Sequence, residues 1–313
     1  MGFKRLVSSP VVYLLRQGED RLSTIGVHVD DGIVASTDEA TARDLLAALK
    51  ARFSLKIMDI VPRFLAMQQE VLSGGDLLWY QEEKVLALLD TFNGQTLRPA
   101  SVPISTTTMQ HVNEAMGGPL LEPTKQHRYH SAVGSVLYLV QNCRPDIALA
   151  VGILPRFVQQ PRVEHWRALL LLLGYLSRTT KAGLLFKREV NRIDELVSIT
   201  VYTDVDFATV VDCKSTSGVC IFMCDTLVAF APKKQTTVAR STTEAEANAL
   251  KLALTMLEFV VQFLGELGVV FTTPVVYEDN TAVIAHMTGP HAYQARTKHL
   301  LVAFSYCRHT ARC

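Results

Sequence analysis

The order of apolar patterns in residues 195 to 313 most constrains the fold of this chain. VSITVYTDVDFA, SGVCIFM and TLVAFAP are alternating or apolar runs of the kind that forms strands. STTEAEANALKLALTMLEFVVQFLGELG follows, with apolar residues at helical spacing between a capping Ser241 and a terminating Gly268. PVVYEDN is predicted to form a strand, and TAVIAHM and RTKHLLVAFSYCR are predicted to form helices. This order predicts a mixed α/β domain of about 115 residues.

Residues 1 to 75 carry a second, strand-rich pattern. VVYLL and residues 25 to 36 are predicted to form a β-hairpin around the polar RQGEDRLS connection. STDEATARDLLAALKARF has an S-x-x-E capping signature at Ser36 and Glu39, which predicts a helix. FLAMQQEVL and LLWY predict another hairpin, because the glycine pair in the SGGD connection tolerates the positive φ of a tight turn.

The pattern becomes helical between residues 76 and 190. QEEKVLALLDTF predicts a helix, and LRPASVPISTTTM is predicted to be a linker. Pro145 and Pro161 separate three apolar helices, which are predicted at 126 to 142, 145 to 159 and 163 to 179. His165 and Trp166 are interpreted as a packing pair at a helix start, and this region shows no catalytic constellation.

Composition and charge limit the class of protein. Of 313 residues, 49% are hydrophobic and 19% are charged, so the chain can bury a sizeable core and is not a disordered tail. The formal net charge is +1, so the chain has no overall basic field. Nucleic acid, if it is a partner, must therefore be held by local basic patches.

The six cysteines indicate an intracellular protein. They show neither a CxxC pair nor histidines at zinc-finger spacing, so we expect reduced thiols, most of them packed in the core. The N-terminal MGFKRLVSSP lacks the apolar stretch of a signal peptide. ALLLLLGYL is too short to span a membrane, and LALTMLEFVVQFLGELGVVF carries Glu258 and Glu266. We therefore expect buried helices, no membrane partner and a cytoplasmic or nuclear location.

Three acids lie at the ends of predicted elements. Asp204 follows the strand VSITVYT, Glu246 lies in the first turns of the long helix, and Asp279 follows PVVYE. Strand ends and helix starts are where an α/β sheet presents groups to a ligand. If the three carboxylates meet, a pair of Mg²⁺ or Mn²⁺ ions would neutralise them and could catalyse phosphodiester hydrolysis. The alternative is that these acids are helix caps and solvated charges.

A second acidic pair, Asp30 and Asp31, lies in VHVDDGIVAS. Adjacent carboxylates between apolar runs are compatible with a divalent-metal site. They are also compatible with a polar turn, since Asp-Asp-Gly is ordinary turn chemistry, and the ten residues alone favour the turn.

A series of segments resembles a known family over nearly the whole chain. They are HVDD (28 to 31), VGSVLYL (133 to 139), RPDIALAV (144 to 151), HWRALLLLLGYL (165 to 176), YTDVDFA (202 to 208), KSTSGVCIF (214 to 222), KKQTTVARSTTEAEANAL (233 to 250), EDNTAV (278 to 283) and RTKHL (296 to 300). In this order and spacing, the chain resembles the C-terminal part of the Pol polyprotein of copia-type LTR retrotransposons. The matching part runs from inside the reverse transcriptase to the end of ribonuclease H.

The resemblance implies three regions with distinct roles. Residues 1 to 75 would be a partial reverse transcriptase palm, 76 to 190 the helical thumb and connection that grips the template-primer, and 195 to 313 a ribonuclease H-like domain. Asp30 and Asp31 match the paired metal-binding aspartates of the polymerase hairpin.

The resemblance also implies a role for the three acids of the last region. Asp204, Glu246 and Asp279 match the carboxylates that bind two Mg²⁺ or Mn²⁺ ions and hydrolyse RNA paired to DNA. His299 would assist proton transfer or product release, with a surface histidine on a basic helix as the alternative. Asp206 and Glu244 are interpreted as solvated charges.

Several positions depart from the family pattern. The upstream polymerase aspartate is missing, so we expect a fragment of a longer element or a decayed copy that does not polymerise DNA alone. His28 stands where the family has Tyr, and Leu65-Ala66 replaces Leu-Gly. Leu301 occupies the position of a fourth ribonuclease H aspartate, and such a loss predicts weak or no nuclease activity.

Clusters of lysine and arginine are the candidates for holding an RNA–DNA hybrid or a template-primer. They are Lys233, Lys234 and Arg240; Arg296, Lys298 and Arg308; and, at the domain junction, Arg178, Lys181, Lys187, Arg188 and Arg192. A solvated face is the alternative for each cluster. The rest of the Pol polyprotein is a further expected partner.

Two rival functions stay open at this point. One is a catalytically inactive decayed or co-opted element product that at most binds nucleic acid or a protein partner. The other is an unrelated metal-dependent phosphoesterase that uses the same three acids.

Overall fold

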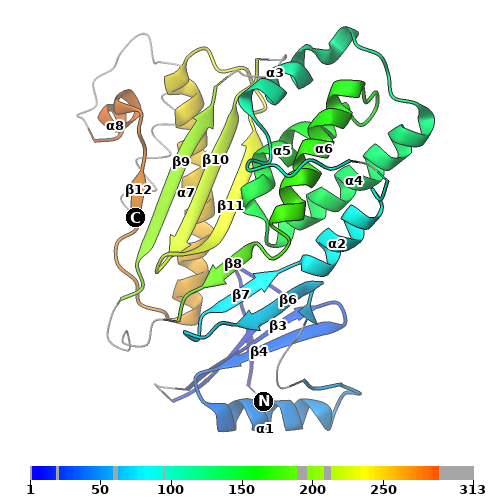
Figure 1. Ribbon diagram of the computed structural model, residues 1–313. Coiled ribbons are helices and arrows are strands. Elements are labelled where there is room, and N and C mark those ends of the chain that lie inside the picture. The colour runs from blue at the N-terminus through cyan, green and yellow to red at the C-terminus, as the bar shows by residue number, and fades with distance from the viewer. Residues whose placement is uncertain are drawn as a thin grey trace.

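The fold is mixed α/β, as predicted, and the residues that the structure describes form three separate four-stranded sheets (Figure 1). The computed structural model describes residues 2–18, 21–58, 63–94, 96–188, 196–207 and 213–288. The N-terminal sheet and its helix lie at one end of the molecule (Figure 1). A helical region and the third sheet lie side by side at the other end (Figure 1).

The first sheet is an antiparallel meander in chain order. Its strands are β1 (Lys4–Arg5), β2 (Val12–Gln17), β3 (Arg21–His28) and β4 (Asp31–Ser36). The predicted RQGEDRLS connection is mostly strand, because β2 extends to Gln17 and β3 begins at Arg21. Residues 25 to 36 are likewise two strands and a turn. Backbone pairing between consecutive strands overrides the preference of these polar residues for a turn.

The helix α1 (Glu39–Lys50) is capped by Asp38, so the predicted capping box at Ser36 is wrong. The Thr41 N–H donates to Asp38 Oδ2 over 2.8 Å. Ser36 is the last residue of β4, where its hydroxyl lies 2.8 Å from that of Ser23 on β3. Ser36 therefore pairs with another strand and does not cap the helix.

The second sheet joins distant segments in the order β5-β6-β7-β8. Its strands are β5 (Arg63–Phe64), β6 (Met67–Val71), β7 (Leu77–Tyr80) and β8 (Gly183–Phe186). The predicted β6–β7 hairpin is present, with positive φ at Gly75 and not at Gly74. β7 pairs with β6 on one side and with β8 on the other. The expected boundary between the palm and helical regions, at residue 75, therefore lies in the turn between β6 and β7.

The turn between β5 and β6 gives Leu65 and Ala66 a structural role. Phe64 and Met67 are paired, and the two residues between them have φ values of 50° and 60°. Positive φ is unfavourable for residues with a Cβ atom. The Ala66 position, where the resemblance has glycine, is therefore strained.

The helical region contains the predicted apolar helices around a common core. Its longer helices are α2 (Glu82–Asp90), α3 (Thr106–Glu114), α4 (Pro123–Asn142), α5 (Ala148–Ile153) and α6 (Val163–Arg178). The short 3-10 turns are η1 (Ala115–Gly117), η2 (Pro145–Ile147) and η3 (Leu154–Phe157). Two predictions are wrong in part. The helix predicted at 145 to 159 is broken into η2, α5 and η3, and the end of the predicted linker forms the start of α3. Ser105 starts α3 by accepting the Thr108 N–H over 3.1 Å.

His165 and Trp166 pack at the start of α6, as predicted. His165 is 2% exposed and Trp166 is 6% exposed. The Arg162 N–H donates to His165 Nδ1 over 2.9 Å, and the imidazole stacks on Phe157. The Trp166 ring lies 5.5 Å from that of Phe92 in the helical core.

The third sheet has the order β11-β10-β9-β12. Its strands are β9 (Ile199–Asp206), β10 (Thr216–Met223), β11 (Thr226–Lys234) and β12 (Val275–Tyr277). All pairs are antiparallel except β12 with β9, which is parallel. The helix α7 (Thr242–Leu267) lies behind β9 and β10, and α8 (Thr281–Thr288) follows β12 (Figure 1). The predicted last helix lies outside the described residues.

The long helix α7 is a core element of this region. By length and apolar composition it could cross a membrane. However, Ala247, Leu250 and Leu254 pack with Val201 and Ile221 of the sheet. Packing of this face on the sheet accounts for the apolar sequence of α7.

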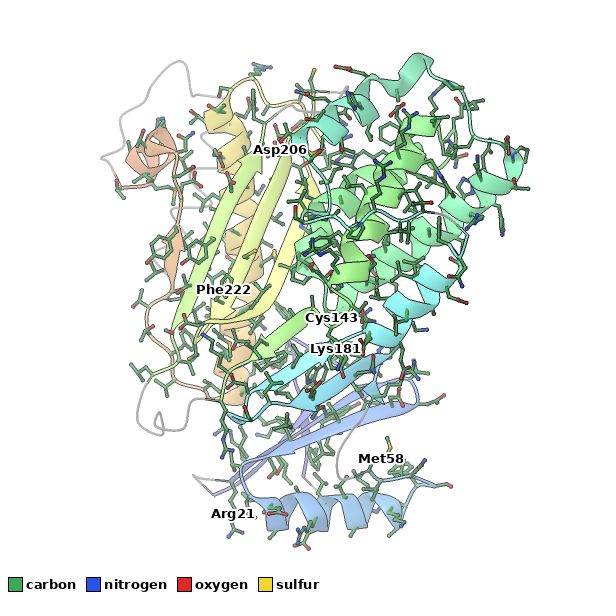
Figure 2. All side chains as sticks on the ribbon, viewed as in Figure 1. Arg21, Met58, Cys143, Lys181, Asp206 and Phe222 are labelled. Atoms are coloured by element: carbon green, nitrogen blue, oxygen red, sulfur yellow. The ribbon has the colours of Figure 1, made fainter. Side chains whose placement is uncertain are left out.

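The four described cysteines are free thiols. Cys143 is buried, as expected for a core thiol, and its Sγ donates to Gln81 Oε1 over 3.3 Å (Figure 2). Cys213 is exposed and is therefore not one of the thiols packed in the core. Cys220 and Cys224 are half-buried.

Candidate metal centre

Asp204 lies inside β9 and not at its end, because the strand continues to Asp206. The alternation of β9 buries Val201 and Thr203, and leaves Tyr202 and Asp204 exposed. Gly218 is paired opposite Asp204 on β10. The Asp204 carboxylate is therefore held on a rigid strand and remains accessible to solvent.

Glu246 is placed by the capped start of α7. The Glu244 N–H donates to the Ser241 hydroxyl, and the Arg240 N–H donates to Glu244 Oε2 over 2.8 Å. Ser241 is therefore the N-cap of α7, and Glu244 also accepts the N–H of the residue before the cap. Glu246 follows in the next turn and is 6% exposed. Glu244 is half-buried, and its carboxylate is a hydrogen-bond acceptor at the start of α7.

Asp279 is placed by the parallel pairing of β12 with β9. Tyr277 lies opposite Tyr202 in this register. Asp279 and Asp204 are each two residues further along, so the pairing carries them toward the same edge of the sheet. Asn280 stabilises the following helix, because its Oδ1 accepts the Ala282 and Val283 N–H groups.

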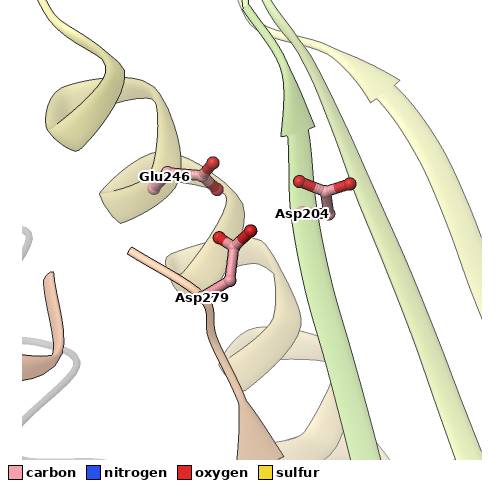
Figure 3. Close-up of side chains that lie close together, drawn as sticks. All are labelled: Asp204, Glu246 and Asp279. Carbon is pink, nitrogen blue, oxygen red and sulfur yellow. The ribbon is translucent and has the colours of Figure 1, made fainter. Parts of the chain in front are cut away.

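The three carboxylates meet, an arrangement that the spacing of the acids left open and the resemblance implied (Figure 3). One ligand oxygen from each of Asp204, Glu246 and Asp279 lies within 4.8 Å of the others. Figure 3 shows that the three side chains come from β9, from α7 and from the segment after β12. Within the described part of the chain, no other trio of acidic, histidine or cysteine side chains has this geometry.

The electrostatics of the cluster favour a bound cation. Burial raises the pKa of Glu246 to about 7, and the charges of Glu278, Asp204 and Asp279 add to the shift. Glu246 Oε2 is buried and has no hydrogen-bond partner among the described residues. A buried, unpaired carboxylate is costly, and carboxylate oxygens are the ligands that Mg²⁺ and Mn²⁺ prefer. These residues therefore fit a divalent cation.

Glu278 is an acidic neighbour that the sequence reasoning missed. Burial raises its pKa to about 7; the Asn280 N–H opposes this shift, and Asp279 and Asp204 add to it. The alternation of β12 was an available signal, since it points every second side chain toward α7.

Asp30 and Asp31 lie where β3 turns into β4. His28 pairs with Asp31, and the connection between them is Val29-Asp30. Both aspartates are exposed, and Val29 has a φ of 51°. Among the residues described here, neither belongs to a cluster of metal-binding geometry. Asp30 thus lies in the turn and Asp31 begins β4, and a metal role for these aspartates stays a prediction.

The structure describes only some of the lysines and arginines that were predicted to hold nucleic acid. Lys233 and Arg240 are exposed, and Lys234 is half-buried. At the junction, Lys181 Nζ lies 4.0 Å from carboxylates of both Glu70 and Glu82. Arg178, Lys187 and Arg188 are exposed. The other predicted residues lie outside the described ranges: Arg192, Arg296, Lys298, His299, Leu301 and Arg308.

The fold and the cluster define a mixed α/β protein with an acidic site that fits a divalent cation. Over 98% of its length, the chain is 31% identical to the retrovirus-related Pol polyprotein from transposon TNT 1-94 of Nicotiana tabacum. It is 30% and 29% identical to those from transposons RE1 and RE2 of Arabidopsis thaliana, also over 98% of the chain. The chain is thus a homologue of retrovirus-related Pol polyproteins of transposons.

The chain spans 20 to 23% of the length of these relatives. No family model matches the sequence, and no solved structure is significantly similar to it. The coarser part of the resemblance, to Pol polyproteins of retrotransposons, is confirmed. The reverse transcriptase and ribonuclease H assignment stays a prediction.

Proposed function

We propose that the chain is the reverse transcriptase and ribonuclease H part of a copia-type Pol polyprotein. In this proposal, residues 195 to 313 hydrolyse the RNA strand of RNA–DNA hybrids. The observation that carries it is the convergence of Asp204, Glu246 and Asp279, whose ligand oxygens lie within 4.8 Å of one another. The relationship to transposon Pol polyproteins supports the choice of substrate class.

Asp204, Glu246 and Asp279 would hold Mg²⁺ or Mn²⁺. When bound, a pair of such ions activates water for attack on a phosphodiester and stabilises the charge of the leaving oxygen. Glu246 is buried on a capped helix, so it is preorganised. Asp204 and Asp279 are exposed and would face the nucleic acid.

Asp204 is open to solvent on one side. A cavity of about 380 Å³ borders Asp204 and lies between the open face of the third sheet and Pro145–Leu149. Lys233, at the end of β11, and Arg240, just before α7, are exposed cations of the same region. We assign them to phosphate contacts, with Lys234 as a weaker candidate.

The first 190 residues belong to the polymerase in this proposal. Asp30 and Asp31 are its metal-binding pair, on the strained turn at Val29. Strained backbone often marks a functional site.

The decisive experiment is cleavage of a hybrid whose RNA strand is end-labelled. The chain and its Leu301→Asp variant are incubated with Mg²⁺. We expect weak cleavage by the chain and a gain of about 10²- to 10³-fold in the variant, since a lost electrostatic group costs roughly that much. Asp204→Asn should abolish the activity in both backgrounds.

Asp206→Asn is the matched control, since it makes the same change on the same strand outside the trio. It should retain activity. Absence of cleavage by both the chain and Leu301→Asp would overturn the proposal. Equal cleavage of double-stranded DNA would instead favour a general phosphoesterase.

A further inference from the structure

We propose that Glu278 is a positioning residue of the metal centre: a fourth carboxylate, on the α7 side of β12, that strengthens divalent-cation binding. The inference rests on the proposed function and adds a residue to its site. It assigns Glu278 no direct ligand bond.

The direction of Glu278 follows from the alternation of its strand. Val275 and Tyr277 are exposed, whereas Val276 packs against the core beneath α7. Glu278 is two residues beyond Val276 and is half-buried. The side chain therefore lies on the side of the sheet from which α7 presents Glu246.

The two oxygens of Glu278 have different surroundings. Oε1 accepts the Asn280 N–H over 3.1 Å, which holds the chain around Asp279. Oε2 is buried and has no hydrogen-bond partner among the described residues. One half of the carboxylate thus orients the segment that carries Asp279, and the other half places an oxygen without a hydrogen-bond partner beside the cluster.

Glu278 borders the cluster, because it directly precedes Asp279 and lies on the side of the sheet that faces α7. The same proximity that is unfavourable between carboxylates favours a cation placed among them. The affinity of an acidic cation site rises with its charge, and groups around the direct ligands commonly alter metal affinity by about 10- to 100-fold.

The test is a Mn²⁺ titration in which free Mn²⁺ is followed by electron paramagnetic resonance. Glu278→Gln keeps an oxygen that can accept the Asn280 N–H and removes only the charge. We expect it to weaken Mn²⁺ binding about 10-fold. Its Tm in EDTA should equal or exceed that of the parent chain, because repulsion among the acids is reduced.

Glu258→Gln is the matched control, since Glu258 is an exposed acid further along α7. It should leave both the Mn²⁺ affinity and the Tm unchanged. Unchanged Mn²⁺ affinity in Glu278→Gln would overturn the inference, and a lower Tm in EDTA with unchanged affinity would show a purely structural role.

Asp204→Asn separates this inference from the proposed function. If the parent chain binds Mn²⁺ and Asp204→Asn does not, the centre exists, and only the behaviour of Glu278→Gln decides the role of Glu278. If the parent chain fails to bind Mn²⁺, both proposals are overturned.

Discussion

Tyr202 and Tyr277 face each other across the parallel pair β9 and β12, and their rings stack with centroids 5.0 Å apart. The two tyrosines are 49% and 53% exposed. Each precedes a carboxylate of the cluster by two residues. This aromatic contact therefore stabilises the register that brings Asp279 to Asp204.

Tyr277→Ala should weaken the pairing of β12. A stacked aromatic pair is worth about 0.5–1.5 kcal/mol beyond burial, so we expect a loss of about 1 kcal/mol in the free energy of unfolding. Mn²⁺ affinity should fall as well, because Asp279 loses its fixed position. Val275→Ala on the same exposed face is the control, and a double-mutant cycle with Tyr202→Ala measures the coupling. A coupling near zero would contradict the prediction.

Removal of divalent cations should lower the stability of the chain at neutral pH. The three carboxylates repel one another, and a ligand that binds only the folded state stabilises it by about 2.7 kcal/mol at 100 times its Kd. Thermal unfolding in excess Mg²⁺ and in EDTA measures the difference. Asp204→Asn should reduce it sharply, and an equal Mg²⁺ effect in that variant would show that the ion binds elsewhere.

Protonation of His165 should destabilise the helical region below neutral pH. Burial lowers the pKa of His165 beneath its usual 6.5, and its Nδ1 is occupied by the Arg162 N–H. The unfolded chain therefore binds the proton first. Stability should be full above pH 6.5 and fall as the pH drops from 6.5 toward the lowered pKa.

His165→Asn tests this prediction, because its amide oxygen can replace Nδ1 as the acceptor. The variant should be less stable near pH 7.5 and should lose part of the acid dependence in urea unfolding. His111→Asn, at an exposed histidine of α3, is the control. An identical pH profile in the parent chain and in His165→Asn would argue against the assignment.

Arg144 is a buried cation that depends on one carboxylate. It is fully buried, donates to both oxygens of Asp146 and to Thr179, and ties η2 to the end of α6. Asp146→Asn should cost about 3–5 kcal/mol, because it leaves Arg144 uncompensated. Glu164→Gln, which breaks the exposed pair with Arg167, should cost under about 1 kcal/mol. Chemical denaturation compares the two variants, and equal losses would contradict the prediction.

Ala66→Gly should stabilise the β5–β6 turn. Ala66 has a φ of 60°, which costs roughly 1–2 kcal/mol for a residue with a Cβ atom. Part of this gain is lost to the greater freedom of glycine in the unfolded chain, so we expect a net gain of about 1 kcal/mol. Gly75→Ala, at φ 84°, should have the opposite sign. A loss of stability in Ala66→Gly, measured by urea unfolding, would contradict this reasoning.

Local sequence patterns were sufficient to predict features that depend only on neighbouring residues. The start and the end of α7 at Ser241 and Gly268 were predicted correctly, because capping depends on neighbouring residues. The cap of α1 was wrong, since Ser36 pairs with Ser23 of another strand. Glu278 was missed because its inward direction depends on which face of β12 packs against α7.

The sequence by itself determined the types and order of most of the elements and the acids that they carry, because periodicity and capping are local properties. Only the tertiary structure decided that β12 runs parallel to β9 in the register that joins Asp279 to Asp204. It also decided that Glu246 is buried and lacks a hydrogen-bond partner among the described residues. Both facts depend on pairing and burial between segments far apart in the chain, which no local pattern encodes.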